Sequence, residues 1–244
     1  MSRIPFLFIF IILIASLPVI NNWLSNRGQT LSDDYIGERV DSYISRNFDR
    51  IINALQEKNN RTNAFRNKIL QYKDQVFDQA YPHAGNENSD IIAVGFFDYS
   101  CGYCKAIKDD VKQLINDGKV KYIFRDSPIF GNNSLKAARS ALAVYFIDKE
   151  KYLDFHYAAL KHTREFSDNV ILNIVKSIGI SESDFNSSMK DNADKIEQMI
   201  DSSKLLVRDL GVGGTPFVVI GDSLFIGATD LSVLRNKVNE LSKK

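Results

Sequence analysis

Cysteine is scarce in this chain, with two cysteines, Cys101 and Cys104, among 244 residues. That number excludes a disulfide-rich scaffold, and two thiolates cannot by themselves fill a four-thiolate zinc or iron–sulfur site. Charge of one sign is lacking as well, because 31 Lys and Arg face 30 Asp and Glu, for a formal net charge of +1. Non-specific nucleic-acid binding normally needs a basic excess, so no nucleic-acid partner is expected. Any chemistry of the two cysteines is therefore expected from them as a pair.

One long apolar run is present, at the amino terminus. Residues 4–20 are interrupted only by two prolines and a serine. The run is longer than the usual hydrophobic region of a signal peptide and slightly shorter than the roughly 20 residues of a spanning helix. We interpret residues 1–20 as a signal peptide or an inner-membrane anchor, followed by a linker at 21–32. Either reading predicts a protein that works outside the cytosol, where disulfide chemistry is permitted.

Residues 33–80 carry a helical pattern with frequent charge. Apolar residues recur at three-to-four spacing over 36–55 and again over 65–76. The polar stretch 59–63 separates the two runs, so two amphipathic helices joined by a break are predicted. Their apolar stripes need a partner surface, which is either the globular body or the same helices of other copies in a coiled-coil-like stalk.

Turn-forming residues at 81–86 mark the expected start of the main domain. Residues 91–97 then form an apolar run with the length of a buried strand. Cys101 and Cys104 follow it and open a helical pattern, and a second strand is predicted at 120–124. Strand, CxxC, helix and strand in this order predict a thioredoxin-like fold.

The helix start explains the chemistry expected of the pair. Unpaired backbone N–H groups and the positive end of the helix dipole favour a thiolate at the first cysteine, so Cys101 is the predicted nucleophile. Cys104 lies one turn inside the helix and is expected to be less exposed and to resolve a mixed disulfide. A static disulfide is disfavoured, because closing so short a loop removes little chain entropy. The three histidines are His83, His156 and His162; none has a finger-type spacing from the pair, so no metal or cofactor is expected.

A second feature lies far along the chain. Two glycines, Thr215 and Pro216 immediately precede the apolar residues 217–220. A proline in such a place often marks a cis peptide in a tight turn, so the Thr215–Pro216 bond is predicted to be cis and to face the CxxC pair. An ordinary proline at a strand entry is the alternative. A return strand at 223–226 and a helix at 230–241 are expected to close the fold.

Five motifs follow one another in order along this part of the chain. They are residues 85–86, the FFDYSCGYCK of 96–105, the FRDSPIFG of 124–131, residues 137–139 and the GGTPF of 213–217. Together they resemble the DsbA family of exported thiol-disulfide oxidoreductases. The resemblance implies an α/β protein with a thioredoxin-like domain at 81–244, a helical domain inserted at about 132–210, and an N-terminal helical oligomerisation segment at 33–80.

The expected site residues follow from these motifs. The predicted catalytic residues are Cys101, Cys104, Thr215 and Pro216, and the predicted substrate-binding residues are Gly102, Tyr103, Gly214 and Thr215. Gly-Tyr between the cysteines and threonine before the proline resemble disulfide isomerases of the DsbC type and the trimeric ScsC-like branch. Strongly oxidising DsbA enzymes commonly carry Pro-His and valine there. In the ScsC-like branch a helical segment joins three copies, so residues 33–80 are expected to form a trimer stalk with 59–63 as its flexible joint.

One position departs from the family pattern. Where many relatives carry a buried acid that relays a proton from the resolving cysteine, this chain has Gly95. Asp98 follows the strand and is expected to be more solvated, so that it tunes Cys101 without replacing a buried base. Lys105 is expected to add positive potential near the pair. The sequence therefore does not identify the group that takes the proton from Cys104.

The predicted function is a periplasmic protein disulfide isomerase that reshuffles wrong disulfides in exported proteins through Cys101 and Cys104. Its expected partners are misfolded or disulfide-containing exported proteins, two further copies of itself, and a membrane reductase of the DsbD type. The alternative is a DsbA-type dithiol oxidase recharged by a DsbB-type membrane oxidant. From another class, the alternatives are a chaperone or a copper-binding module, since two thiolates suit Cu(I).

Overall fold

Residues 33–243 of the chain are described by a computed structural model. The predicted signal peptide or anchor at 1–20 and the linker at 21–32 lie outside the described residues. The described residues fall into two units, which divide between Asn59 and Asn60. Within 33–243, no helix is both long enough and apolar enough to cross a bilayer.

The described part of the first unit contains helix α2 (Asp33–Arg46) and the beginning of α3 (Phe48–Gln71). The two helices are separated at Asn47, whose side-chain amide donates to the carbonyl of Tyr43 at 2.8 Å. The break predicted at 59–63 is wrong, because α3 runs through that stretch without interruption. Asparagine costs a helix only a few tenths of a kcal/mol per residue, which is too little to stop a helix that continues on both sides.

The second unit is built on one mixed sheet. Its strands are β1 (His83–Gly85), β2 (Ile92–Phe97), β3 (Lys121–Asp126), β4 (Phe217–Ile220) and β5 (Ser223–Ile226). The spatial order is β1-β3-β2-β4-β5. β2 and β3 are parallel, while β1, β4 and β5 each run antiparallel to their neighbours. β2 thus lies at the centre, where its apolar run is covered on both faces.

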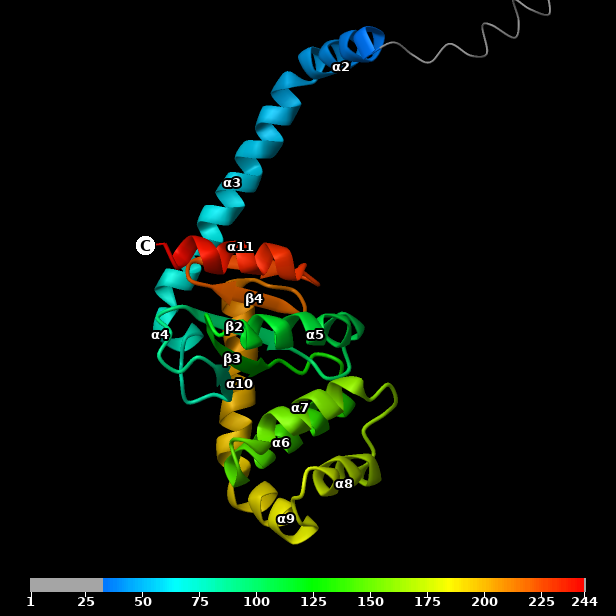
Figure 1. Ribbon diagram of the computed structural model, residues 1–244, viewed down its shortest axis with the longest axis vertical. Coiled ribbons are helices and arrows are strands. Elements are labelled where there is room, and N and C mark those ends of the chain that lie inside the picture. The colour runs from blue at the N-terminus through cyan, green and yellow to red at the C-terminus, as the bar shows by residue number, and fades with distance from the viewer. Residues whose placement is uncertain (1–32, 244) are drawn as a thin grey trace, which may run out of the picture. The chain divides into compact units, whose positions relative to one another are not determined.

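Helices account for most of the remaining chain in this unit. They are α4 (Lys73–Val76), α5 (Gly102–Asn116), α6 (Asn132–Ile147), α7 (Lys151–Lys161), α8 (Asp168–Ser177), α9 (Glu182–Asp191), α10 (Ala193–Leu210) and α11 (Leu231–Leu241). Helices α6 to α9 gather in a cluster beside the sheet, and the long α10 returns from that cluster to the sheet (Figure 1). Helices α6 to α10 lie between β3 and β4 in the sequence, in the stretch where the helical insertion was predicted.

Alternate side chains of the central strands enter two hydrophobic clusters. Ala93, Phe97, Tyr122, Phe124, Val218 and Ile220 join residues of α5, α6, α7 and α11 in the first. Val94, Phe96, Ile123, Phe217 and Val219 join the end of α3, α4 and the last turns of α10 in the second. This alternation is the two-residue period of a strand whose two faces are both buried. The thioredoxin-like fold with an inserted helical domain is confirmed.

Three details differ from the sequence-based expectation. The compact unit begins at Asn60 rather than at residue 81, because Ile69 and Val76 are buried in the second cluster. Strand β1 lies where only a turn-rich boundary was expected. Helix α9 was not predicted as a helix, and it begins at the capping residue Ser181, whose hydroxyl accepts a hydrogen bond from the backbone of Asp184 at 3.0 Å.

Candidate active site

The cysteine pair lies at the start of α5, as predicted. Cys101 is the N-terminal capping residue of the helix, with φ −74° and ψ 121°, and its side chain does not cap the helix. Its backbone N–H donates to the carbonyl of Asp98 at 3.1 Å, and its carbonyl accepts the first helical bond from Lys105 at 3.1 Å. The Cys101 sulfur therefore lies at the positive end of the helix dipole.

The loop before β4 contacts Cys101 directly. The Thr215–Pro216 bond is cis, as predicted. The Cys101 thiol donates to the Thr215 carbonyl oxygen, with Sγ and O 3.3 Å apart. The CxxC pair and the cis-proline loop, which were predicted separately from the sequence, are therefore in contact. Of the predicted substrate-binding residues, Gly102 and Tyr103 are exposed, while Gly214 and Thr215 are half-buried.

Exposure does not distinguish the two cysteines, contrary to expectation, because Cys101 is 3% exposed and Cys104 is 2% exposed. Their surroundings do distinguish them. Burial raises the pKa of the Cys104 thiol, and the neighbouring Cys101 raises it further. Opposing contributions come from the Thr215 hydroxyl and from the Asp98 N–H, which lies 3.5 Å from the Cys104 sulfur. Cys104 therefore rests as a neutral thiol and needs a proton acceptor before it can attack a disulfide.

Asp98 is buried rather than solvated, which corrects the sequence-based expectation. Its carboxylate accepts backbone hydrogen bonds from Ser100 at 2.6 Å, Ile129 at 2.7 Å and Phe130 at 3.2 Å. Backbone donors from two loops, which no sequence pattern revealed, replace the water that the carboxylate loses. Asp98 thereby fastens the loop that carries Cys101 to the loop that follows β3.

That second loop adds two surface residues that sequence analysis missed. Ile129 and Phe130 are 46% and 55% exposed, and Tyr103 is 69% exposed. All three are large apolar or aromatic side chains close in the chain to groups of the site. The signal for the first two was present in the FRDSPIFG motif, but only the hydrogen bonds to Asp98 connect that motif to the cysteine pair.

The histidines are not arranged around the cysteines as ligands. His156 is buried, its Nδ1 lies 3.1 Å from the Tyr99 hydroxyl, and burial lowers its pKa to about 3. His83 lies near Glu87 at the surface, and His162 near the carbonyl of Glu165. Within the described residues 33–243, no group of three or more His, Cys, Asp or Glu side chains is arranged to hold a metal ion.

Comparison with known proteins agrees with this geometry. The DSBA-like thioredoxin domain family matches residues 93–239. A curated relative, disulfide bond formation protein D of Bacillus subtilis (strain 168), is 22% identical over 187 residues, which cover 71% of this chain and 84% of the relative.

Two solved structures extend the comparison. The thiol-disulfide exchange protein alpha-DsbA2 from Wolbachia pipientis is 75% identical with a TM-score of 0.73, over 74% of this chain and 97% of that chain. The catalytic domain of Proteus mirabilis ScsC is 27% identical with a TM-score of 0.65, over 73% of this chain and 99% of that chain. With a CxxC pair at a helix start beside a cis-proline loop, the chain belongs to the DsbA-like thioredoxin family and is a thiol-disulfide oxidoreductase.

Proposed function

We propose that this chain is a protein disulfide isomerase that reshuffles wrong disulfides through Cys101 and Cys104. The observation that carries the proposal is the burial of Cys104, which raises the pKa of its thiol. A neutral thiol attacks disulfides slowly, so a mixed disulfide on Cys101 persists while substrate thiols compete for it. Persistence of the mixed disulfide favours isomerisation over simple oxidation.

The proposed reaction consumes no electrons. The Cys101 thiolate attacks a substrate disulfide, so that one S–S bond breaks, a mixed disulfide forms and a substrate thiolate leaves. A different substrate thiolate then attacks the substrate sulfur of the mixed disulfide and expels the Cys101 thiolate. If Cys104 attacks Cys101 first, the substrate leaves reduced and the enzyme becomes oxidised. Return to the reduced state then needs two electrons, for which we propose a membrane reductase of the DsbD type.

Substrate binding is proposed for the residues around Cys101. The Thr215 carbonyl lies at the Cys101 sulfur, where it can pair with the backbone of an extended chain, and Gly214 leaves room for that chain. Around this point Tyr103, Ile129 and Phe130 present exposed apolar surface. Misfolded chains expose apolar segments, so this surface suits them as substrates.

Two assays run side by side test the direction of the reaction. An isomerase recovers the activity of a scrambled disulfide substrate faster than it oxidises a reduced one. Cys104→Ser is expected to keep part of the recovery and to lose oxidation, because a substrate thiol can replace Cys104. The matched variant Cys101→Ser is expected to lose both. If the parent protein rapidly oxidises the reduced substrate but does not reshuffle the scrambled one, the isomerase proposal is wrong and the dithiol oxidase is favoured.

We also propose that the first unit assembles three copies of the chain. Supporting this, large apolar side chains are exposed at helical spacing on α2 and the first turns of α3: Ile36, Val40, Tyr43, Ile44, Ile51 and Leu55. Such a stripe is typical of helices that pack on other helices. Light scattering of a chain that begins at Asn60 is expected to give a monomer, and the full chain a trimer. The deletion stops there because Ile69 and Val76 belong to the core of the second unit. A monomeric full chain contradicts the assembly.

Export to the periplasm is proposed from residues 1–20. The supporting feature is the apolar run behind Arg3. Fusing these residues to alkaline phosphatase, which is active only where disulfides form, is expected to give activity in a bacterial host. A matched fusion in which Ile12 and Leu13 are changed to Arg is expected to be inactive, and equal activity of both fusions would overturn the assignment.

A further inference from the structure

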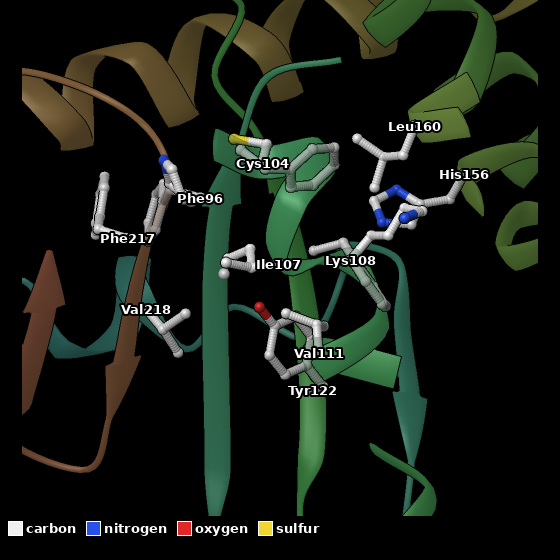
Figure 2. A pocket seen from close by; sticks show the side chains of 14 residues that line it. Phe96, Cys104, Ile107, Lys108, Val111, Tyr122, His156, Leu160, Phe217 and Val218 are labelled. Atoms are coloured by element: carbon white, nitrogen blue, oxygen red, sulfur yellow. The ribbon is translucent and has the colours of Figure 1, made fainter. Parts of the chain in front are cut away.

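Cys104 borders a small cavity of about 20 Å³. Its walls are formed by Gly95, Phe96, Phe97, Cys104, Ile107, Lys108, Val111, Tyr122, Phe124, His156, Leu160, Pro216, Phe217 and Val218. Figure 2 shows Cys104 at one end of this group and Tyr122 at the other, with the Tyr122 hydroxyl directed toward Ile107. A volume of this size is enough for one water molecule when polar groups are present to bond it.

The Tyr122 hydroxyl occupies the space of a side chain at position 95. A Cβ atom on Gly95 would lie 1.9 Å from the Tyr122 hydroxyl oxygen and 2.6 Å from its Cζ atom. Tyr122 is 3% exposed. Within residues 33–243, the hydroxyls of Tyr81, Tyr99 and Tyr145 bond to protein groups and that of Tyr122 does not. This hydroxyl is therefore available to a water in the cavity.

Five other titratable side chains lie around Cys104 and Tyr122. These side chains are Asp98, Cys101, Lys108, His156 and Tyr157. The Asp98 carboxylate is held by three backbone amides, and Lys108 carries no acceptor when charged. Cys101 is bonded in the mixed disulfide at that stage. Burial lowers the pKa of His156 to about 3 and raises that of Tyr157 to about 12, so both stay neutral and take up no proton near pH 7.

We propose that a water molecule, positioned in this cavity by Tyr122, accepts the proton of Cys104 when Cys104 attacks the mixed disulfide. The inference rests on the proposed role of Cys104 as the resolving thiol, and it holds for isomerase and oxidase alike. A phenol hydroxyl both donates and accepts hydrogen bonds. By accepting one from the water, the Tyr122 hydroxyl turns a lone pair of that water toward the thiol. Tyr122 is thus a positioning residue.

The step balances without a further reagent. The S–H bond of Cys104 breaks and its proton passes to the water. The new thiolate attacks the Cys101 sulfur, the Cys101–Cys104 disulfide forms, and the substrate leaves as a thiolate. The proton then reaches solvent beside Lys108, which is the one residue of the cavity wall that is not fully buried, with 20% of its side chain exposed. Burial first, then Tyr157 and Cys104, raise the pKa of Tyr122, so the phenol itself remains protonated.

The resolving step is measurable by itself. The reduced full chain is mixed with oxidised glutathione, quenched with acid at intervals, and analysed by mass spectrometry for the glutathione adduct and for the intramolecular disulfide. Tyr122→Phe removes only the hydroxyl. It is expected to slow conversion of adduct to disulfide about tenfold at pH 7 and to approach the parent rate toward pH 9, where hydroxide forms the thiolate without relay. Formation of the adduct by Cys101 is expected to be unchanged.

The control variant is Tyr152→Phe, which removes a hydroxyl from an equally buried tyrosine outside the cavity wall. It is expected to resolve the adduct at the parent rate. If Tyr122→Phe resolves at the parent rate at every pH, or is slowed equally at every pH, the inference is overturned. Cys104→Ser separates this failure from a failure of the proposed function, because it must accumulate the adduct if Cys104 is the resolving thiol at all.

Discussion

Replacing His156 by asparagine is expected to change how the stability of this protein depends on pH. His156 is 3% exposed, and burial lowers its pKa to about 3. In the unfolded chain a histidine has a pKa near 6.5. Between these two values the unfolded chain binds a proton that the folded chain does not bind, so acid favours unfolding.

The size of the effect follows from the two pKa values. Above pH 6.5 the ring is neutral in both states and contributes no pH dependence. Below pH 6.5 each pH unit removes about 1.4 kcal/mol from the free energy of unfolding, and the loss is complete near pH 3 at ~5 kcal/mol. At pH 5 the loss amounts to ~2 kcal/mol. Asparagine cannot titrate, and its side chain can still meet the Tyr99 hydroxyl that lies 3.1 Å from Nδ1 of His156.

Urea unfolding from pH 7.5 to pH 5, followed by circular dichroism, measures this difference. A plot of the free energy of unfolding against pH is expected to have a smaller slope for His156→Asn than for the parent. The difference corresponds to about one proton fewer taken up on unfolding. Phe155→Leu is the control, because it shortens a fully buried neighbour and lowers stability equally at every pH. Parallel curves for His156→Asn and the parent would refute the reasoning.

Three other substitutions are predicted from the same structure. Asp98→Asn leaves backbone amides without a charged acceptor and is expected to lower the free energy of unfolding by ~2 kcal/mol at pH 7 in urea titrations. Asp126→Asn is expected to raise the melting temperature at pH 8 and not at pH 4, because burial raises the pKa of Asp126 well above its ordinary value, and stability is lost as pH rises from the unfolded value near 4. Gly95→Ala is expected to cost ~2 kcal/mol by overpacking against the Tyr122 hydroxyl, and the added substitution Tyr122→Leu is expected to recover part of that loss in the same titrations.

Each of these has a contradicting result. For Asp98, the exposed Asp201→Asn is the control and is expected to change stability by less than about 0.5 kcal/mol; equal effects of the two variants would remove the special role of Asp98. If Asp126→Asn raises the melting temperature at pH 4 as much as at pH 8, titration of Asp126 is excluded as the cause of the increase. If the double variant loses as much free energy of unfolding as the two single variants together, Gly95 and Tyr122 do not share space.

Local sequence patterns predict much of the fold. The continuous apolar run of β2 predicts a strand buried on both faces, and the three-to-four spacing after Cys101 predicts α5. Helix α9 escaped prediction because it is short and strongly polar, with only Phe185 and Ser188 buried. β1 escaped because three residues with a glycine at φ 101° look like a turn until they pair with β3. Short elements depend on their partners more than on their own residues.

By itself, the sequence determined that two thiols share a helix start and that Thr215 and Pro216 precede a strand. These are near-neighbour features, and the backbone within a few residues decides them. The tertiary structure decided that the Thr215 carbonyl contacts Cys101, that Asp98 is buried among amide donors, and that the Tyr122 hydroxyl lies over Gly95. The physical reason is that burial and the partners of a polar group depend on side chains brought from distant parts of the chain, and these set the protonation of Cys104.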